Sequence, residues 1–377
     1  MNASFTRSFI VLLCCAGFFS CASTAVTTSK RSPREKYESK TANTVGKNNP
    51  VLSKWRNAGE YSLHHPLAAP NNYFESGRFF ATDSSATSFA VNIKRGQKLT
   101  ASFRKSLGTP NKVYLDLWNA TNRLDPNFLI ASDTINNMVE YIAGNDMDLI
   151  LRFQGEIGFA GNYFFTVQTG PSLLYPIAAN VKAPIGSFWG DGRDGGTRKH
   201  EGVDIMAPKH SVAVAAASGV VTDVSENSLG GKVVSIHPDR SNLSVYYAHL
   251  DSQFVQEGQR VQAGDPIGLT GNTGNARNTV SHLHFGIYVG YNVAIDPLLF
   301  IKPVPAKKVI DHPFPTNASF SILGPVKIYP EPNRAAIPGD LTKNTVVTVK
   351  AVTDEFYRVA LADGRSGFIL RSAVRLK

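Results

Sequence analysis

The chain has 377 residues, of which 42% are apolar and 18% are charged, and its formal net charge is +10. This length predicts two or three domains, and the apolar fraction is sufficient for ordinary hydrophobic cores. Cys14, Cys15 and Cys21 are the only cysteines, so a disulfide framework in the body of the protein is excluded. The 31 glycines and 21 prolines favour a mainly β, turn-rich architecture over helix bundles.

The positive net charge attracts acidic partners at long range. The lysines and arginines are dispersed along the chain, and no nucleic-acid recognition motif is present. We therefore expect no nucleic-acid partner, and favour an anionic envelope polymer or membrane surface. The sequence leaves the oligomeric state open.

The N-terminus has the features of an export signal. Arg7 precedes an apolar run from Phe9 to Phe19, which is too short to span a bilayer and suits a signal peptide. Phe18-Phe-Ser-Cys21 resembles the lipobox of bacterial lipoproteins, which implies a lipid anchor at Cys21. The alternative is ordinary secretion with cleavage near Ala25. We predict a signal peptide over 1–21 and a periplasm-facing protein, with the outer membrane favoured because Ala22 is not the aspartate that often retains lipoproteins in the inner membrane.

Residues 22–66 are polar and basic with few apolar side chains. Such a composition cannot bury a core, so we predict a flexible basic tether. A coil of this length has a root-mean-square span of roughly 35–40 Å.

Apolar residues alternate with polar ones over 67–170. Val113, Leu115 and Leu117 show this period of two, as do Leu149, Leu151 and Phe153, and Tyr163, Phe165 and Val167. The pattern predicts strands with one buried face and hence an antiparallel β-sandwich. Gly161-Asn-Tyr-Phe-Phe-Thr-Val is similar to the last strand of pre-peptidase sandwich domains. The domain is expected to be a spacer, or else to bind substrate or inhibit.

Three segments within 171–302 carry groups that bind metals or transfer protons: His200 and Asp204, then His249, then His282 and His284. Imidazole and carboxylate are good ligands for zinc, and zinc hydrolases use three protein ligands with one position left for water. The run from His282 to Val289 is typical of a strand, so His282 and His284 face the same side.

The surroundings of these residues resemble peptidase family M23, the lysostaphin or LytM-type zinc endopeptidases. The segments that carry the resemblance are Gly202-Val-Asp-Ile-Met-Ala-Pro-Lys, Tyr247-Ala-His-Leu-Asp, Val261-Gln-Ala-Gly-Asp-Pro-Ile-Gly and His282-Leu-His-Phe-Gly. The resemblance implies a LytM-type β-sheet domain in which His200, Asp204 and His284 hold Zn²⁺. It also implies that His249 and His282 position water and stabilise the transition state, and the choice of general base between them stays open.

The family implies hydrolysis of peptide crosslinks in bacterial peptidoglycan, with peptidoglycan stem peptides as partners. Gly202, between the first two ligands, is expected to leave room for a peptide that contains D-amino acids. One alternative is a catalytically silent or regulatory M23-like protein that activates another cell-wall hydrolase. Another is a zinc peptidase with a protein substrate.

Residues 303–318 contain several prolines and are expected to be a linker. Over 319–377, Val326-Lys-Ile-Tyr-Pro-Glu-Pro, Val346-Val-Thr-Val and the segment around the Asp363-Gly364 hairpin turn resemble the bacterial SH3 fold. Phe368 stands where relatives commonly have Trp. This SH3-like barrel is expected to bind cell wall, or else to pack against the catalytic domain.

Overall fold

The computed structural model describes residues 31–81, 86–105, 112–133, 135–290, 292–305, 310–315 and 319–374. The predicted signal peptide over 1–21, the lipid anchor at Cys21 and the first residues of the predicted tether lie outside these ranges. The described chain is mainly β, as the sequence predicts. Within it, we find no helix that is both long enough and apolar enough to cross a membrane.

Two helices occupy most of the segment that was expected to be a flexible tether, so that expectation is wrong for the described part. They are α1 (Pro33–Val45) and α2 (Pro50–His64). Each has a clear start signal: Ser32 and Glu35 form a capping box on α1, and Asn49 caps α2. The few apolar residues of the segment gather on one face of α2, where Leu52 and Trp55 are fully buried. Composition averages over the segment and therefore hides this face.

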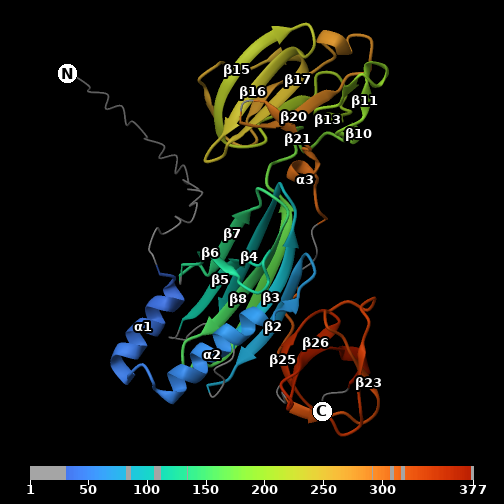
Figure 1. Cartoon of the computed structure of the whole chain (residues 1–377). Coiled ribbons are helices and arrows are strands. Elements are labelled where there is room, and N and C mark those ends of the chain that lie inside the picture. The colour runs from blue at the N-terminus through green and yellow to red at the C-terminus, as the bar shows by residue number, and fades with distance from the viewer. Residues whose placement is uncertain are drawn as a thin grey trace, which may run out of the picture. The chain divides into compact units, whose positions relative to one another are not determined.

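Two sheets follow the helices along the chain (Figure 1). Side chains from both sheets form one hydrophobic core. The first has five strands in the order β1 (Leu67–Ala68), β3 (Ala86–Ile93), β8 (Met147–Gly155), β5 (Val113–Asn119) and β6 (Asn127–Ala131). In the second sheet, β2 (Tyr73–Phe79), β9 (Gly161–Pro171), β4 (Gln97–Lys105) and β7 (Met138–Ile142) are neighbours in that order. The alternating residues used to predict strands lie on β5, β8 and β9 and are all buried. The indole of Trp55 donates to the carbonyl of Gly155 at 2.7 Å, which places α2 against β8.

The C-terminal strands extend the second sheet. Its remaining members are β25 (Val346–Val352), β26 (Phe356–Leu361), β27 (Ser366–Leu370) and β22 (Ser319–Ser321), while β23 (Val326–Ile328) and β24 (Gly339–Leu341) form a separate pair. β25 pairs antiparallel with β2, with Ser76 opposite Val352. The predicted turn at Asp363-Gly364 joins β26 and β27, and Gly364 has the positive φ of 88° that such a turn requires. Phe368 is fully buried in the core shared by the first two sheets.

A ten-stranded sheet forms the central part of the chain. Its strands are β10 (Ile185–Ser187), β13 (Val203–Ile205), β14 (Val212–Val214), β15 (Gly219–Asn227), β16 (Gly231–Pro238), β17 (Leu243–Gln253), β18 (Arg260–Val261), β19 (Pro266–Thr270), β20 (Leu283–Val289) and β21 (Val293–Ile295). The short strands β11 (Gly192–Arg193) and β12 (Arg198–Lys199) form a hairpin, and helix α3 (Leu298–Ile301) follows the sheet.

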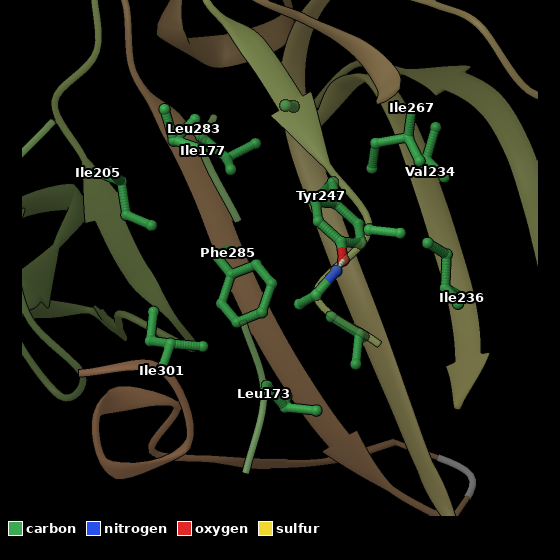
Figure 2. Close-up of a cluster of buried hydrophobic side chains, with 14 of the residues drawn as sticks. Leu173, Ile177, Ile205, Val234, Ile236, Tyr247, Ile267, Leu283, Phe285 and Ile301 are labelled. Carbon is green, nitrogen blue, oxygen red and sulfur yellow. Dashed lines mark hydrogen bonds between the residues drawn. The ribbon is translucent and has the colours of Figure 1, made fainter. Parts of the chain in front are cut away.

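The core of this sheet lies on one of its faces (Figure 2). Tyr247 is fully buried there, and its hydroxyl accepts a hydrogen bond from the backbone N–H of Ala216 at 2.7 Å. Phe285 packs against Tyr247 with 5.3 Å between ring centroids. Because side chains alternate along a strand, the residues beside these core positions are directed to the opposite face.

Candidate metal centre

Strand alternation brings Asp204 and His284 together on the face opposite the core. On β13, Val203 and Ile205 are fully buried in the core and Asp204 lies between them. On β20, His284 lies in the same way between Leu283 and Phe285, which are also fully buried. Asp204 and His284 are direct partners in the antiparallel register, and Asp204 Oδ1 is 3.1 Å from His284 Nδ1. Their proximity therefore follows from the sheet itself.

His200 reaches the same point from the end of the β11–β12 hairpin. Its Nδ1 lies 2.8 Å from the carbonyl oxygen of Phe188, and since a carbonyl only accepts, Nδ1 carries the proton. The unprotonated Nε2 is then directed at the site, 3.0 Å from Asp204 Oδ1 and 3.0 Å from His284 Nδ1. A backbone carbonyl that holds the distal nitrogen in this way is the usual support of a metal-binding histidine.

The donor atoms of His200, Asp204 and His284 all lie within 4.8 Å of one another. Bonds of about 2.0–2.1 Å in a tetrahedron place zinc ligands roughly 3.3 Å apart, close to the 3.0–3.1 Å separations here. Two imidazole nitrogens and one carboxylate oxygen are also a donor set that zinc prefers. The residues present therefore fit a zinc ion.

His249 joins the site through an irregularity in β17. Tyr247 and Leu250 are both fully buried in the core, although simple alternation would direct them to opposite faces. The register with β16 shifts in this stretch, and His249 has a positive φ of 62°. The extra residue is a β-bulge that turns the imidazole toward the site. The N–H of His249 Nδ1 donates to the carbonyl of Thr273 at 3.0 Å, which leaves Nε2 unprotonated.

His282 lies beside His249, with 5.0 Å between the ring centroids. Its Nδ1 is 2.9 Å from the carbonyl oxygen of Val280, so it too carries its proton on Nδ1 in the neutral form. Its Nε2 is 3.9 Å from Asp204 Oδ1. One pocket is lined by all the residues that the sequence singled out, namely His200, Asp204, His249, His282 and His284.

Burial and hydrogen bonds set the charge states of the site. Burial alone would raise the pKa of Asp204, but the contacts of its carboxylate with His200 and His284 outweigh this effect and hold the pKa well below its ordinary value. Burial, with His282 and His284 nearby, lowers the pKa of His249 to about 4. Burial also lowers the pKa of His284 despite the hydrogen bond with Asp204. Asp204 is thus ionised near neutral pH, and His249 and His284 are neutral.

Arg193 is a member of the site that the sequence analysis missed. Its Nη2 donates to Asp204 Oδ2 at 2.7 Å and to the hydroxyl of Ser187 at 2.7 Å. A single arginine among Gly190, Gly192, Gly195 and Gly196 is the available signal, but it does not reveal the partner of its side chain.

The position of Gly202 also differs from expectation. A Cβ at this residue would lie 2.5 Å from the carbonyl oxygen of Phe285 and 2.8 Å from Cε1 of His284. The missing side chain therefore allows the start of β13 and β20, which carries His284, to approach closely. It does not leave open room for a peptide.

The fold and the site together define a β-sheet protein with a candidate metal centre, in which three N and O donors have two further histidines beside them. Residues 198–297 match the family model of peptidase family M23. The chain therefore contains an M23 peptidase domain.

Three relatives illustrate the similarity. The peptidoglycan DD-endopeptidase ShyC of Vibrio cholerae is 33% identical over 242 residues, 63% of this chain and 49% of ShyC. An L-Ala–D-Glu endopeptidase of Bacillus subtilis is 34% identical over 122 residues, 30% of this chain and 37% of its own. The murein hydrolase activator NlpD of Salmonella typhimurium is 36% identical over 104 residues, 27% of this chain and 26% of its own. The chain thus spans about half or less of each of these relatives.

Proposed function

We propose that this protein is a zinc-dependent endopeptidase that hydrolyses peptide crosslinks of bacterial peptidoglycan. The observation that carries the proposal is the complete set of His200, Asp204, His249, His282 and His284 in one pocket. The match to family M23, and the relatives ShyC and ShyA of Vibrio cholerae, which are named as peptidoglycan DD-endopeptidases, support the same activity.

In this proposal His200 Nε2, Asp204 Oδ1 and His284 Nδ1 hold the metal. When bound, zinc supplies a Lewis acid that polarises the scissile carbonyl and activates water near neutral pH. The carbonyl of Phe188 fixes the tautomer of His200, and the strand register holds Asp204 opposite His284. The ligand geometry is thus largely built by the backbone.

His249 and His282 handle protons and stabilise the developing oxyanion in this proposal. Each is anchored through Nδ1–H to a backbone carbonyl, which leaves its Nε2 to accept or donate a proton. The lowered pKa of His249 keeps that ring neutral near pH 7, the state a proton acceptor needs. The two rings are adjacent, and the geometry does not divide the role of general base between them.

The proposed setting is the cell envelope, with peptidoglycan stem peptides as the partner. The proposal includes export by the signal peptide over 1–21 and a lipid anchor at Cys21 in the outer membrane. These steps rest on the sequence of the N-terminus.

The second candidate function is activation of another cell-wall hydrolase without turnover. It is favoured by the similarity to NlpD, which is named as a murein hydrolase activator. The complete set of metal and proton-handling residues favours catalysis. Turnover by the purified protein separates these two functions.

Digestion of purified sacculi by residues 22–377, which include every described residue, tests the proposal. We expect soluble muropeptides whose release stops with a chelator and returns with zinc, and their masses identify the bond that is cut. Zinc-loaded protein that releases nothing alone but stimulates an added amidase would support the activator function instead. If the protein cleaves a panel of folded and unfolded proteins but leaves the sacculi intact, the substrate is a protein.

A further inference from the structure

The two carboxylate oxygens of Asp204 have different partners. Asp204 Oδ2 accepts a hydrogen bond from Arg193 Nη2 at 2.7 Å. Asp204 Oδ1, on the other side of the carboxylate, is 3.0 Å from His200 Nε2 and 3.1 Å from His284 Nδ1. One oxygen therefore faces the other donors of the metal centre, and the second faces a guanidinium.

The surroundings of Arg193 hold it in this position. The same Nη2 donates to the hydroxyl of Ser187 at 2.7 Å, and that hydroxyl donates to Asp191 Oδ2 at 2.8 Å. A chain of hydrogen bonds thus runs from Asp191 through Ser187 and Arg193 to Asp204. The side chain of Arg193 is 26% exposed, so water shields this contact only in part.

The backbone that presents Arg193 has an unusual turn. Arg193 pairs with Arg198 across the β11–β12 hairpin. Between them, Asp194, Gly195 and Gly196 all have positive φ values, of 52°, 70° and 93°. Glycine adopts this region readily and aspartate more easily than most residues, so the glycine-rich sequence permits the tight turn that directs Arg193 at the site.

We propose that Arg193 is a positioning residue that keeps Asp204 a one-oxygen ligand of the metal. This inference rests on the metal centre of the proposed function. A carboxylate can bind a cation through one oxygen or both. A charge-assisted hydrogen bond to Oδ2 stabilises the one-oxygen arrangement. Because Oδ2 then does not bind the metal, the coordination position that a catalytic zinc centre leaves open for water stays free.

Arg193→Met tests this role, because methionine keeps much of the length of the side chain and removes its donors. The matched control is Arg198→Met, on the same hairpin and in the same pocket, where the guanidinium pairs with Asp194 at 3.0 Å and no contact with a metal ligand is found among the described residues. Zinc affinity is measured by competition with a chromogenic chelator. Coordination number is measured from the visible absorption of the Co²⁺-substituted protein, which is strong for four ligands and weaker for five.

We expect Arg193→Met to weaken zinc binding by about 10- to 100-fold, the usual effect of losing a partner of a metal ligand. Its Co²⁺ absorption should fall as Asp204 binds through both oxygens, while Arg198→Met matches wild type in both measurements. Circular dichroism confirms folding. If Arg193→Met does not fold, Arg193→Lys replaces it, with an affinity loss expected between wild type and that range.

Wild-type zinc affinity and Co²⁺ absorption in a folded Arg193 variant would overturn this inference alone. Failure of the wild-type protein to bind zinc would overturn the inference together with the proposed metal centre. The two failures are therefore distinguished by the wild-type measurement.

Discussion

Among the non-glycine residues of the described strands, His249 is the one with a positive φ. It has φ of 62° in the middle of β17, a region that non-glycine residues rarely adopt, although histidine is among those that do so more often. Backbone strain of this kind costs on the order of 1–3 kcal/mol and concentrates at functional sites. Here the strain has an evident role, because without the bulge the His249 side chain would be directed into the core.

A second prediction for a single residue concerns the close contacts of Gly202. Gly202→Ala places a Cβ 2.5 Å from the carbonyl oxygen of Phe285 and 2.8 Å from the ring of His284. Since one of these neighbours is backbone, β13 and β20 must separate and displace His284, a ligand of the proposed metal centre. We expect weaker zinc binding by at least about 10-fold and a lower melting temperature, measured by chelator competition and calorimetry.

Gly170→Ala is the matched control, because a Cβ there meets nothing within 4 Å and the residue lies on β9, outside the site. Equal zinc affinity in the two variants would contradict the account of Gly202.

At the scale of single elements, α2 is a helix where composition predicts a coil, and the buried contacts of a few side chains hold it in place. Trp55 is fully buried, donates to the carbonyl of Gly155, and has the guanidinium of Arg34 4.5 Å from its ring centroid. Arg34 in turn donates to Gln154 at 2.8 Å. Both helices are therefore attached to β8 by buried contacts.

Trp55→Ala should destabilise the protein by about 3–5 kcal/mol, the usual cost of removing a buried large aromatic side chain. Val51→Ala, on the same helix with a half-exposed side chain, should cost less than about 0.5 kcal/mol. Chemical denaturation of both variants measures the difference. If the two variants have the same stability, α2 is not held as the structure indicates.

The sequence could predict those parts of the fold and site in which local pattern and tertiary structure agree. Alternation predicted the strands that contain Leu115, Leu151 and Phe165, because each strand has one buried face. The motif residues from His200 to His284 meet in one pocket. The bulge at His249 and the partner of Arg193 were not predictable, because each depends on a contact with a distant segment that composition and periodicity do not encode. The α2 helix does have local signals, the Asn49 cap and an apolar face, but a prediction from the composition of the whole segment misses them.

At the scale of the whole molecule, a buried ionic cluster connects the C-terminal strands to the N-terminal sheets. Arg358 on β26 makes two hydrogen bonds to Glu75 on β2, at 2.7 and 2.9 Å. The hydroxyls of Tyr73 and Tyr163 also donate to this carboxylate. Glu75 is fully buried and Arg358 is 5% exposed. We infer that residues 319–374 act as part of one body with the N-terminal sheets. Cell-wall binding by these residues, as predicted, would therefore involve this body as a whole.

Glu75→Gln should therefore destabilise the protein by about 3–5 kcal/mol, because it leaves the buried guanidinium without its counter-charge. Amides of β26 and β27 should exchange hydrogen faster in this variant. Glu355→Gln, which removes an exposed partner of Arg334, is the control and should have almost no effect. C-terminal strands whose exchange is unchanged in Glu75→Gln would show that they fold independently of the N-terminal sheets.

The most direct test of the proposed peptidase centre is muropeptide release by wild type and His249→Asn, both loaded with zinc. Asparagine tolerates the positive φ at this position and lacks the titratable ring. We expect both proteins to fold and bind zinc, and the variant to release muropeptides at least about 100-fold more slowly, the usual value of a positioned acid–base group. Equal release by the two proteins, or none by zinc-loaded wild type, would contradict the account.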